Sequence, residues 1–191
     1  MQEPISDAEL LKAIARKDTA AFKVFMSRYQ DRVYRTVYRF IGDSESSRDL
    51  VQDIFIKVYR ASASYAPDAG LFTWLYRITA NHCINFLQKQ KRDPLYKAEE
   101  QPVQTLSSAH NSGQSASPEN NLVRQERTVM VRRAIDSLPQ RQKMAITLLR
   151  FEGLSYHEIS EILGCSVSAV ESLIFRGMEA LKKLLSEEQL P

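Results

Sequence analysis

Residues 153–185 decide the fold, and their sequence is GLSYHEISEILGCSVSAVESLIFRGMEALKKLL. Ser155 and Glu158 have the spacing of a capping box, which starts a helix. Gly164 follows that helix and permits a tight turn, and a second helix is expected to start near Ser166. Two short helices joined by a glycine turn are typical of a helix-turn-helix, whose second helix enters the DNA major groove. An ordinary helical hairpin is the alternative interpretation.

The second helix of this motif has two faces. Apolar residues at helical spacing predict a buried side that comprises Val167, Val170, Ile174, Leu181 and Leu185. The opposite arc is polar and is a candidate DNA surface, with Ser168, Ser172, Arg176, Glu179 and Lys183.

The N-terminal half has the same helical periodicity. Asp18 is a candidate N-cap for a helix that starts at Thr19 and stops at Gly42, and Ser44 opens the next helix. The inward side of that next helix is predicted to comprise Leu50, Val51, Ile54, Phe55 and Val58. No stretch alternates as a strand does, so we predict an all-α protein.

The stretch Tyr65–Arg92 combines aromatic rings with a basic helix. Pro67 and Gly70 break the chain, and a long helix is expected from about residue 72 to 91. One side of this helix is apolar, and the other is a polar stripe of Arg77, Asn81, Asn85, Gln88 and Arg92.

This stretch has the residue types that bind single-stranded nucleic acid. Exposed rings stack on bases and nearby cations attract the backbone. Asn81 and Asn85 lie one turn apart and can hydrogen-bond base edges. Tyr76 and Phe86 are interpreted as core residues, whereas Trp74 falls on the polar side of the helix.

Residues 96–121 are rich in Pro, Ser and Asn and poor in large apolar side chains. Such a segment cannot bury enough surface to offset its ordering entropy. We therefore predict two small helical domains, residues 1–95 and 122–191, joined by a flexible linker, the second domain being a helix-turn-helix. Pro118 is expected at the first position of the helix that follows the linker.

Composition and charge narrow the classes of function that this chain can have. The net charge of +3 predicts weak DNA binding by the free chain. No apolar run resembles a signal peptide or a membrane span, and Cys83 and Cys165 have no metal or disulfide spacing, so a cytoplasmic protein is expected. The three histidines are scattered, and none has the partners of a general base. We expect no catalytic site, no metal, no cofactor and no small-molecule substrate.

A polar set, Asp49, Gln52 and Asp53, faces outward on the helix that starts at Ser44. It lacks His and Cys and does not resemble a metal site. A solvated helix face and a protein-docking face are both open interpretations.

Three blocks together resemble a bacterial extracytoplasmic-function sigma factor. They are DLVQDIFIKVYRA, FTWLYRITANHCINFL and LPQRQKMAITLLRFEGLSYHEISEILGCSVSAVESLIFRGMEAL. The resemblance runs from about Asp7 to Leu185, with the linker unmatched. It implies an initiation factor that binds core RNA polymerase, through the β′ clamp helices and the β flap, and promoter DNA. It also implies control by an anti-sigma factor, without membrane insertion.

The resemblance implies roles for three sets of residues. The polymerase-docking set is Asp49, Gln52, Asp53 and Phe55. The set for opened −10 DNA is Tyr65, Phe72, Trp74, Arg77, Asn81, Asn85 and Gln88. The set for the −35 element is Ser168, Glu171, Ser172, Phe175, Arg176 and Lys183.

One departure concerns the −35 set. Many relatives carry Arg or Lys where this chain has Glu171, Leu173 and Met178, which implies fewer phosphate contacts here. Two other functions compete with the sigma factor. One is a regulator that uses its helix-turn-helix alone, and the other is an adaptor that binds proteins through residues 49–60 without contacting DNA.

Overall fold

The computed structural model describes residues 5–65, 70–92 and 118–187, and within these ranges it contains helices and no strand. This confirms the predicted all-α class. The helices are α1 (Asp7–Ala15), α2 (Thr19–Ile41), α3 (Ser44–Ala61), the 3₁₀ turn η1 (Ser62–Ser64), α4 (Leu71–Arg92), α5 (Pro118–Ser137), α6 (Gln140–Glu152), α7 (Tyr156–Leu163) and α8 (Val167–Glu187).

Local sequence sets the helix ends as expected. The Asp18 carboxylate accepts hydrogen bonds from the backbone N–H groups of Ala20 and Ala21, at 2.8 and 3.0 Å, and starts α2. Helix α3 begins at Ser44 as predicted, and Asp43 is its N-cap. Ser155 and Glu158 form the predicted capping box of α7.

Gly42 ends α2 in the left-handed conformation, with φ of 93°. A Cβ here would also lie 1.9 Å from an Arg132 guanidinium nitrogen. That guanidinium donates to the Arg39 carbonyl at 3.1 Å, which places a cation at the negative end of the α2 dipole. Glycine is therefore favoured at position 42 by its φ, and a Cβ there would displace the Arg132 guanidinium from this contact.

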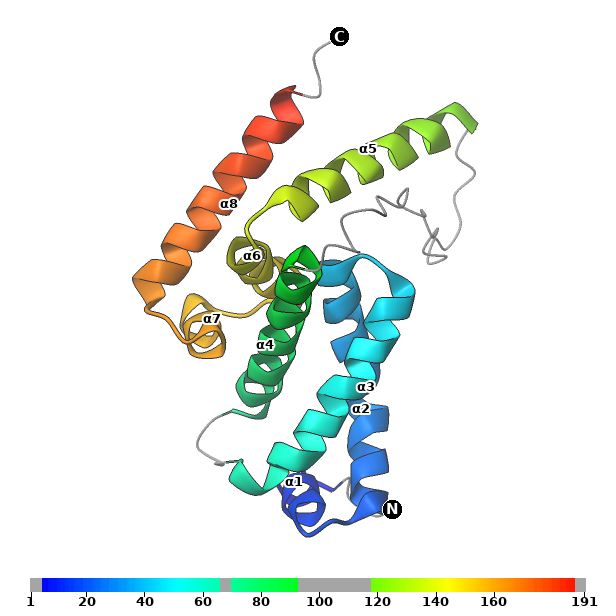
Figure 1. Cartoon of the computed structure of the whole chain (residues 1–191), viewed down its shortest axis with the longest axis vertical. Coiled ribbons are helices and arrows are strands. Elements are labelled where there is room, and N and C mark those ends of the chain that lie inside the picture. Colours follow the sequence, from blue (N-terminus) through cyan, green and yellow to red (C-terminus); the bar gives the residue numbers. More distant parts are fainter. Residues whose placement is uncertain (1–4, 66–69, 93–117, 188–191) are drawn as a thin grey trace.

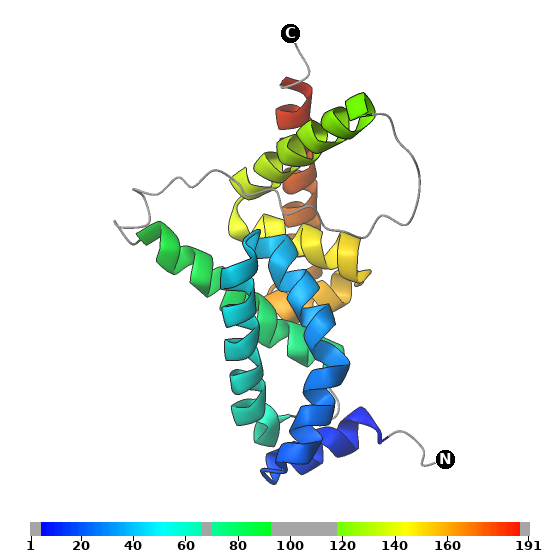
Figure 2. The ribbon, with the colours of Figure 1, turned by 90° about the vertical axis from the view of Figure 1, so that its right-hand side faces the viewer.

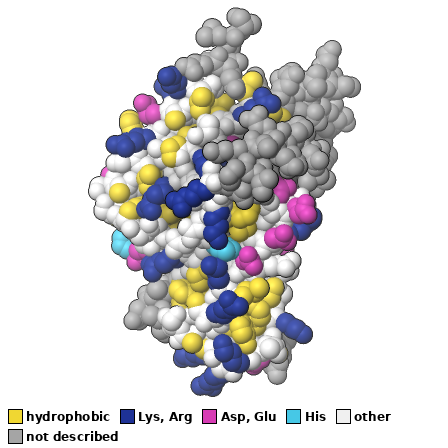
Figure 3. Space-filling model, viewed as in Figure 1, with side chains coloured by type: hydrophobic (Ala, Val, Ile, Leu, Met, Phe, Trp, Pro, Cys, Tyr) yellow, Lys and Arg dark blue, Asp and Glu magenta, His cyan; other side chains and the backbone are white. Residues whose placement is uncertain are grey.

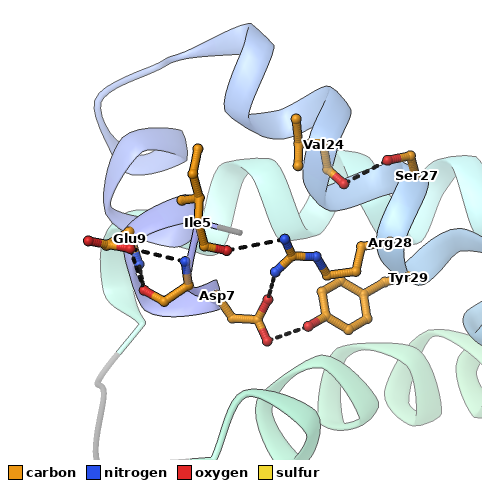
Figure 4. A network of polar contacts seen from close by, with 8 residues as sticks. Ile5, Asp7, Glu9, Val24, Ser27, Arg28 and Tyr29 are labelled. Atoms are coloured by element: carbon orange, nitrogen blue, oxygen red, sulfur yellow. Dashed lines mark hydrogen bonds and ion pairs between the residues drawn. The ribbon is translucent and has the colours of Figure 1, made fainter. Parts of the chain in front are cut away.

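Helices α1 to α4 form an N-terminal bundle (Figure 1). Its core is built on large apolar side chains of α2, among them Phe25, Val37 and Phe40. Figure 4 shows how α1 is tied to α2: the Asp7 carboxylate accepts from the Tyr29 hydroxyl and pairs with the Arg28 guanidinium. Burial raises the pKa of Tyr29 to about 12, and the Asp7 carboxylate adds to that effect.

Helices α5 to α8 form a C-terminal bundle (Figure 1). Helix α7 turns into α8 at Gly164, which has φ of 60°, and this confirms the predicted helix-turn-helix. Val170 and Ile174 of α8 are buried as predicted. Val167 is exposed, which corrects the prediction. It lies in the first turn of α8, where the chain has just left α7 and no neighbouring helix covers it.

The predicted linker, residues 96–121, falls mostly outside the described residues. Helix α5 begins at Pro118, so proline occupies the first helical position as expected, and the last residues assigned to the linker belong to this helix.

The two bundles pack directly on each other. Helix α4 lies against α7 and α6, and α2 lies against α6 (Figures 1 and 2). Buried residues of both bundles, from Leu10 to Ile174, form a single contiguous apolar cluster. We call this contact between α2 and α4 on one side and α6 and α7 on the other the interbundle seam.

Candidate nucleic-acid interface

The polar stripe of α4 is exposed as predicted. Arg77, Asn81, Asn85 and Gln88 all face solvent. The opposite side of α4 is anchored in the core by Leu75, Thr79 and Cys83, among others. Burial raises the pKa of the Cys83 thiol to about 12, so this cysteine is an inert core residue.

The predicted stacking rings lie at the start of α4, and they differ in exposure. Tyr65 and Trp74 are half-buried and pack edge to face, with ring centroids 5.2 Å apart. Phe72 is 37% exposed, and the Arg32 guanidinium lies 4.5 Å from its ring centre. Residues 66–69 of the predicted capture loop lie outside the described residues. Among the three predicted stacking rings, Phe72 therefore presents the most surface to a base.

The outer arc of α8 is exposed along its length. All six residues predicted for the −35 element face solvent: Ser168, Glu171, Ser172, Phe175, Arg176 and Lys183. Phe175 is 66% exposed, a large apolar area for an isolated surface residue. The Ser166 hydroxyl accepts from the Ala169 backbone N–H at 3.2 Å and caps this helix. Helix α8 therefore has an exposed polar face from which the Phe175 ring projects.

The polymerase-docking set is split by the structure. Asp49, Gln52 and Asp53 are exposed on α3, where Figure 3 shows acidic side chains gathered at the edge of the molecule. Phe55 is 1% exposed and belongs to the core, so its assignment as a contact residue is corrected: its position on the α3 wheel points inward. Ile56 is instead 47% exposed beside the acidic residues. Its spacing of seven from Asp49 could have identified it.

His82 lies beneath this face. Its Nε2 is 3.6 Å from the Asp53 carboxylate, which is an ion-pair distance but too long for a hydrogen bond. Burial lowers the pKa of His82, and Lys57 lowers it further, while Asp53 opposes both.

The seam contains a buried carboxylate that sequence reasoning missed. The Glu152 side chain, at the end of α6, is 4% exposed. It accepts from Arg32 Nε at 3.0 Å, from Thr36 Oγ1 at 2.6 Å and from the Tyr76 hydroxyl. We call these residues, together with Arg39 at 3.6 Å, the Glu152 cluster. Nothing in the sequence pairs α6 with α2, because the partners are more than a hundred residues apart.

Two residues of α4, Tyr76 and Arg77, contact the C-terminal bundle. Burial raises the pKa of Tyr76 to about 12, with a contribution from Glu152, so its hydroxyl remains a donor at neutral pH. Arg77 of the polar stripe donates from Nε to the Glu161 carbonyl of α7 at 3.1 Å. The first helix of the helix-turn-helix therefore contacts one of the predicted −10 residues.

The described ranges contain no group of three or more His, Cys, Asp or Glu side chains placed to hold a metal ion. None of the helices described is both long enough and apolar enough to cross a membrane.

Comparisons with known proteins cover both bundles. Residues 25–93 match the family Sigma-70 region 2, and residues 128–181 match Sigma-70, region 4. The chain is 37% identical over 182 residues to the ECF RNA polymerase sigma-E factor of Escherichia coli, covering 95% of each chain. The chain belongs to the extracytoplasmic-function sigma factors. The RNA polymerase sigma-H factor of Pseudomonas aeruginosa is 34% identical over 94% of this sigma factor and 93% of its own length.

Two solved structures share the fold of this sigma factor. CnrH in complex with the cytosolic domain of CnrY has a TM-score of 0.67 at 23% identity, covering 96% of this chain and 99% of that one. The sigma factor RpoE in complex with the anti-sigma factor NepR from Bartonella quintana has a TM-score of 0.62 at 22% identity, covering 86% and 96%. Most predicted contact residues of the sigma factor lie within the two matched regions, and Lys183 lies just beyond the second.

Proposed function

We propose that this sigma factor binds core RNA polymerase and directs it to promoters with a −10 and a −35 element of a stress- or signal-regulated gene set. Residues 1–95 dock on the polymerase and hold the −10 DNA, and residues 122–191 recognise the −35 element. The observation that carries this proposal is the pair of exposed polar faces, on α4 and α8, of helices whose opposite sides are buried. A regulator that used only its helix-turn-helix would leave the α4 stripe without a role.

Opened −10 DNA is assigned to the start and the stripe of α4. Phe72 offers a ring with the Arg32 guanidinium over one of its faces, which combines a surface for a base with a cation for its phosphate. Asn81 and Asn85 are exposed one turn apart and can select bases through hydrogen bonds. Phe72→Ala should weaken binding of forked promoter DNA by about 1–3 kcal/mol. Asn81→Ala should relax base preference more than affinity, since phosphate contacts set most of the affinity.

Polymerase docking is assigned to the outer face of α3, with Asp49, Gln52, Asp53 and Ile56. A polar face around one exposed apolar side chain is typical of a protein interface. Asp53→Arg and Ile56→Asp should each weaken binding to core polymerase by on the order of 1–2 kcal/mol. Asp31→Arg is the matched control, because it reverses an exposed charge on α2, outside this face. Equal binding by all three variants would remove the assignment.

The chemistry is assigned to the polymerase, so the sigma factor itself is not an enzyme, and it acts in the cytoplasm with that partner. A regulatory anti-sigma factor is a further proposed partner. The support is the fold relative that was solved with an anti-sigma factor.

Run-off transcription tests the function as a whole. Purified core polymerase with this chain should produce discrete transcripts from genomic fragments, and core polymerase without it should not. The absence of promoter-dependent transcripts, despite binding to core polymerase, would favour an adaptor over a sigma factor.

A further inference from the structure

The Glu152 cluster is a buried contact with several hydrogen bonds rather than an exposed ion pair. A buried carboxylate is costly unless charges and hydrogen bonds compensate it. Here the side chain is 4% exposed and three side chains donate to it, with Arg39 as an additional cation nearby. Every donor comes from the N-terminal bundle, and the acceptor comes from the C-terminal bundle.

Without Glu152, the N-terminal bundle would present an anion site. Two guanidinium groups, from Arg32 and Arg39, and two hydroxyl groups, from Thr36 and Tyr76, would surround one position. This donor set suits a phosphate oxygen as well as it suits a carboxylate. In the present structure the Glu152 carboxylate occupies the place that the anion would take.

The anion site adjoins the proposed −10 surface. Arg32 contacts both Glu152 and the ring of Phe72, which lies at the start of α4. On the same side, α7 packs along α4, and its Glu161 carbonyl accepts from Arg77. Separation of the bundles would release Arg32, Arg39 and Arg77 together, and two of them adjoin the proposed −10 residues: Arg32 lies at Phe72, and Arg77 belongs to the α4 stripe.

We propose that Glu152 is an internal competitor for a backbone phosphate of the opened −10 strand. With Glu152 in the anion site the C-terminal bundle covers part of α4, and the strand binds when this bundle moves away. The inference rests on the proposed binding of opened DNA by residues 1–95. Its physical consequence is that the free chain binds single strands more weakly than its donor groups allow, because only the open fraction is competent.

The test uses the full chain and a fluorescein-labelled oligo-dT strand, with a methylphosphonate strand of the same length as an uncharged control. Glu152→Gln should bind oligo-dT about tenfold more tightly than the wild type, because the competent fraction rises. Glu161→Gln is the matched control, since it removes the same charge from an exposed side chain of the adjacent helix. The methylphosphonate strand has no charged phosphate for the anion site, so it should bind Glu152→Gln much more weakly than oligo-dT does.

Arg32→Gln in the Glu152→Gln background tests whether the phosphate binds at Arg32. The double variant should lose most of the gain if Arg32 holds the strand. Equal gains for Glu152→Gln and Glu161→Gln would overturn the proposal, because a general charge effect would then suffice. A gain that survives Arg32→Gln would overturn it too, because the phosphate would bind elsewhere.

Phe151→Ala covers the case in which Glu152→Gln does not fold. It removes a ring of α6 that lies 4.6 Å from the Arg39 guanidinium across the seam and leaves all four donor groups for the strand, so it should give a smaller gain in the same direction. Circular dichroism checks that each variant keeps the wild-type helix content. Run-off transcription by the wild type is measured separately: its failure would contradict the proposed function, whereas the oligo-dT series decides the role of Glu152 independently.

Discussion

At the scale of single residues, Arg176 should dominate recognition of the −35 element. No other Lys or Arg precedes residue 182 within α8, and Arg176 lies on its exposed arc. If it binds a guanine edge, Arg176→Ala should cost about 1–3 kcal/mol and relax specificity at one base pair. Binding to single-base variants of the −35 element at two salt concentrations measures this. A uniform loss, with a salt slope smaller by about one unit, would indicate a phosphate contact instead.

Glu171 lies on the same surface as Arg176 and is expected to weaken DNA binding, whereas Arg176 strengthens it. Its exposed carboxylate repels phosphate and can accept from a cytosine amino group. Glu171→Arg should therefore strengthen binding to every −35 variant and reduce the difference between them. The same binding panel measures it, and an unchanged preference would show that Glu171 does not contact a base.

His82 should make stability depend on pH. Burial, followed by Lys57, lowers its folded-state pKa below the ordinary 6.5, so the unfolded chain takes up the proton first. Its contribution to stability is present above pH 6.5 and is lost as the pH falls through the folded-state pKa. The melting temperature should fall between about pH 7.5 and about pH 5.5, and His82→Asn should reduce that fall. If the melting temperature of the His82→Asn variant falls as much as that of the wild type, the pH dependence comes from carboxylates instead.

At the scale of elements, the approach of α8 to α6 depends on Gly177. A Cβ at this position would lie 2.6 Å from Ile146 Cδ1. Gly177→Ala should lower stability by about 1 kcal/mol net, because an overpacking cost of about 1–3 kcal/mol exceeds the helix-propensity gain of about 1 kcal/mol. Urea unfolding measures it. Ile146→Val removes the crowded methyl group, so it should lower stability less in the Gly177→Ala background than in the wild type. If the two losses of stability simply add, the contact between residues 146 and 177 is contradicted.

At the scale of the whole molecule, the seam should hold the two bundles together even without a covalent connection. Interdomain contacts of this kind resemble transient protein interfaces, and residues of both bundles share one apolar cluster. Fragments 1–95 and 122–191 should associate with a Kd on the order of micromolar, measured by calorimetry. Glu152→Gln in the second fragment should weaken association by about tenfold, since the hydrogen-bonded charge is lost. No association of the wild-type fragments would contradict the seam.

The sequence by itself determined the helices and the outward faces that they carry. Caps at Asp18, Ser155 and Gly164 act on neighbouring backbone atoms, so their effect is legible without knowledge of any distant residue. Helical periodicity placed Asn81, Asn85 and Arg176 on exposed faces for the same reason.

Only the tertiary structure decided which helices meet, and so which residues change role. Phe55 is core and Ile56 is surface because α3 packs with one particular rotation, and Val167 is exposed because no helix covers the first turn of α8. The pairing of Glu152 with Arg32 joins positions 120 residues apart in sequence. No local pattern encodes such a contact, because its free energy comes from desolvation and hydrogen bonding that arise only once the bundles pack.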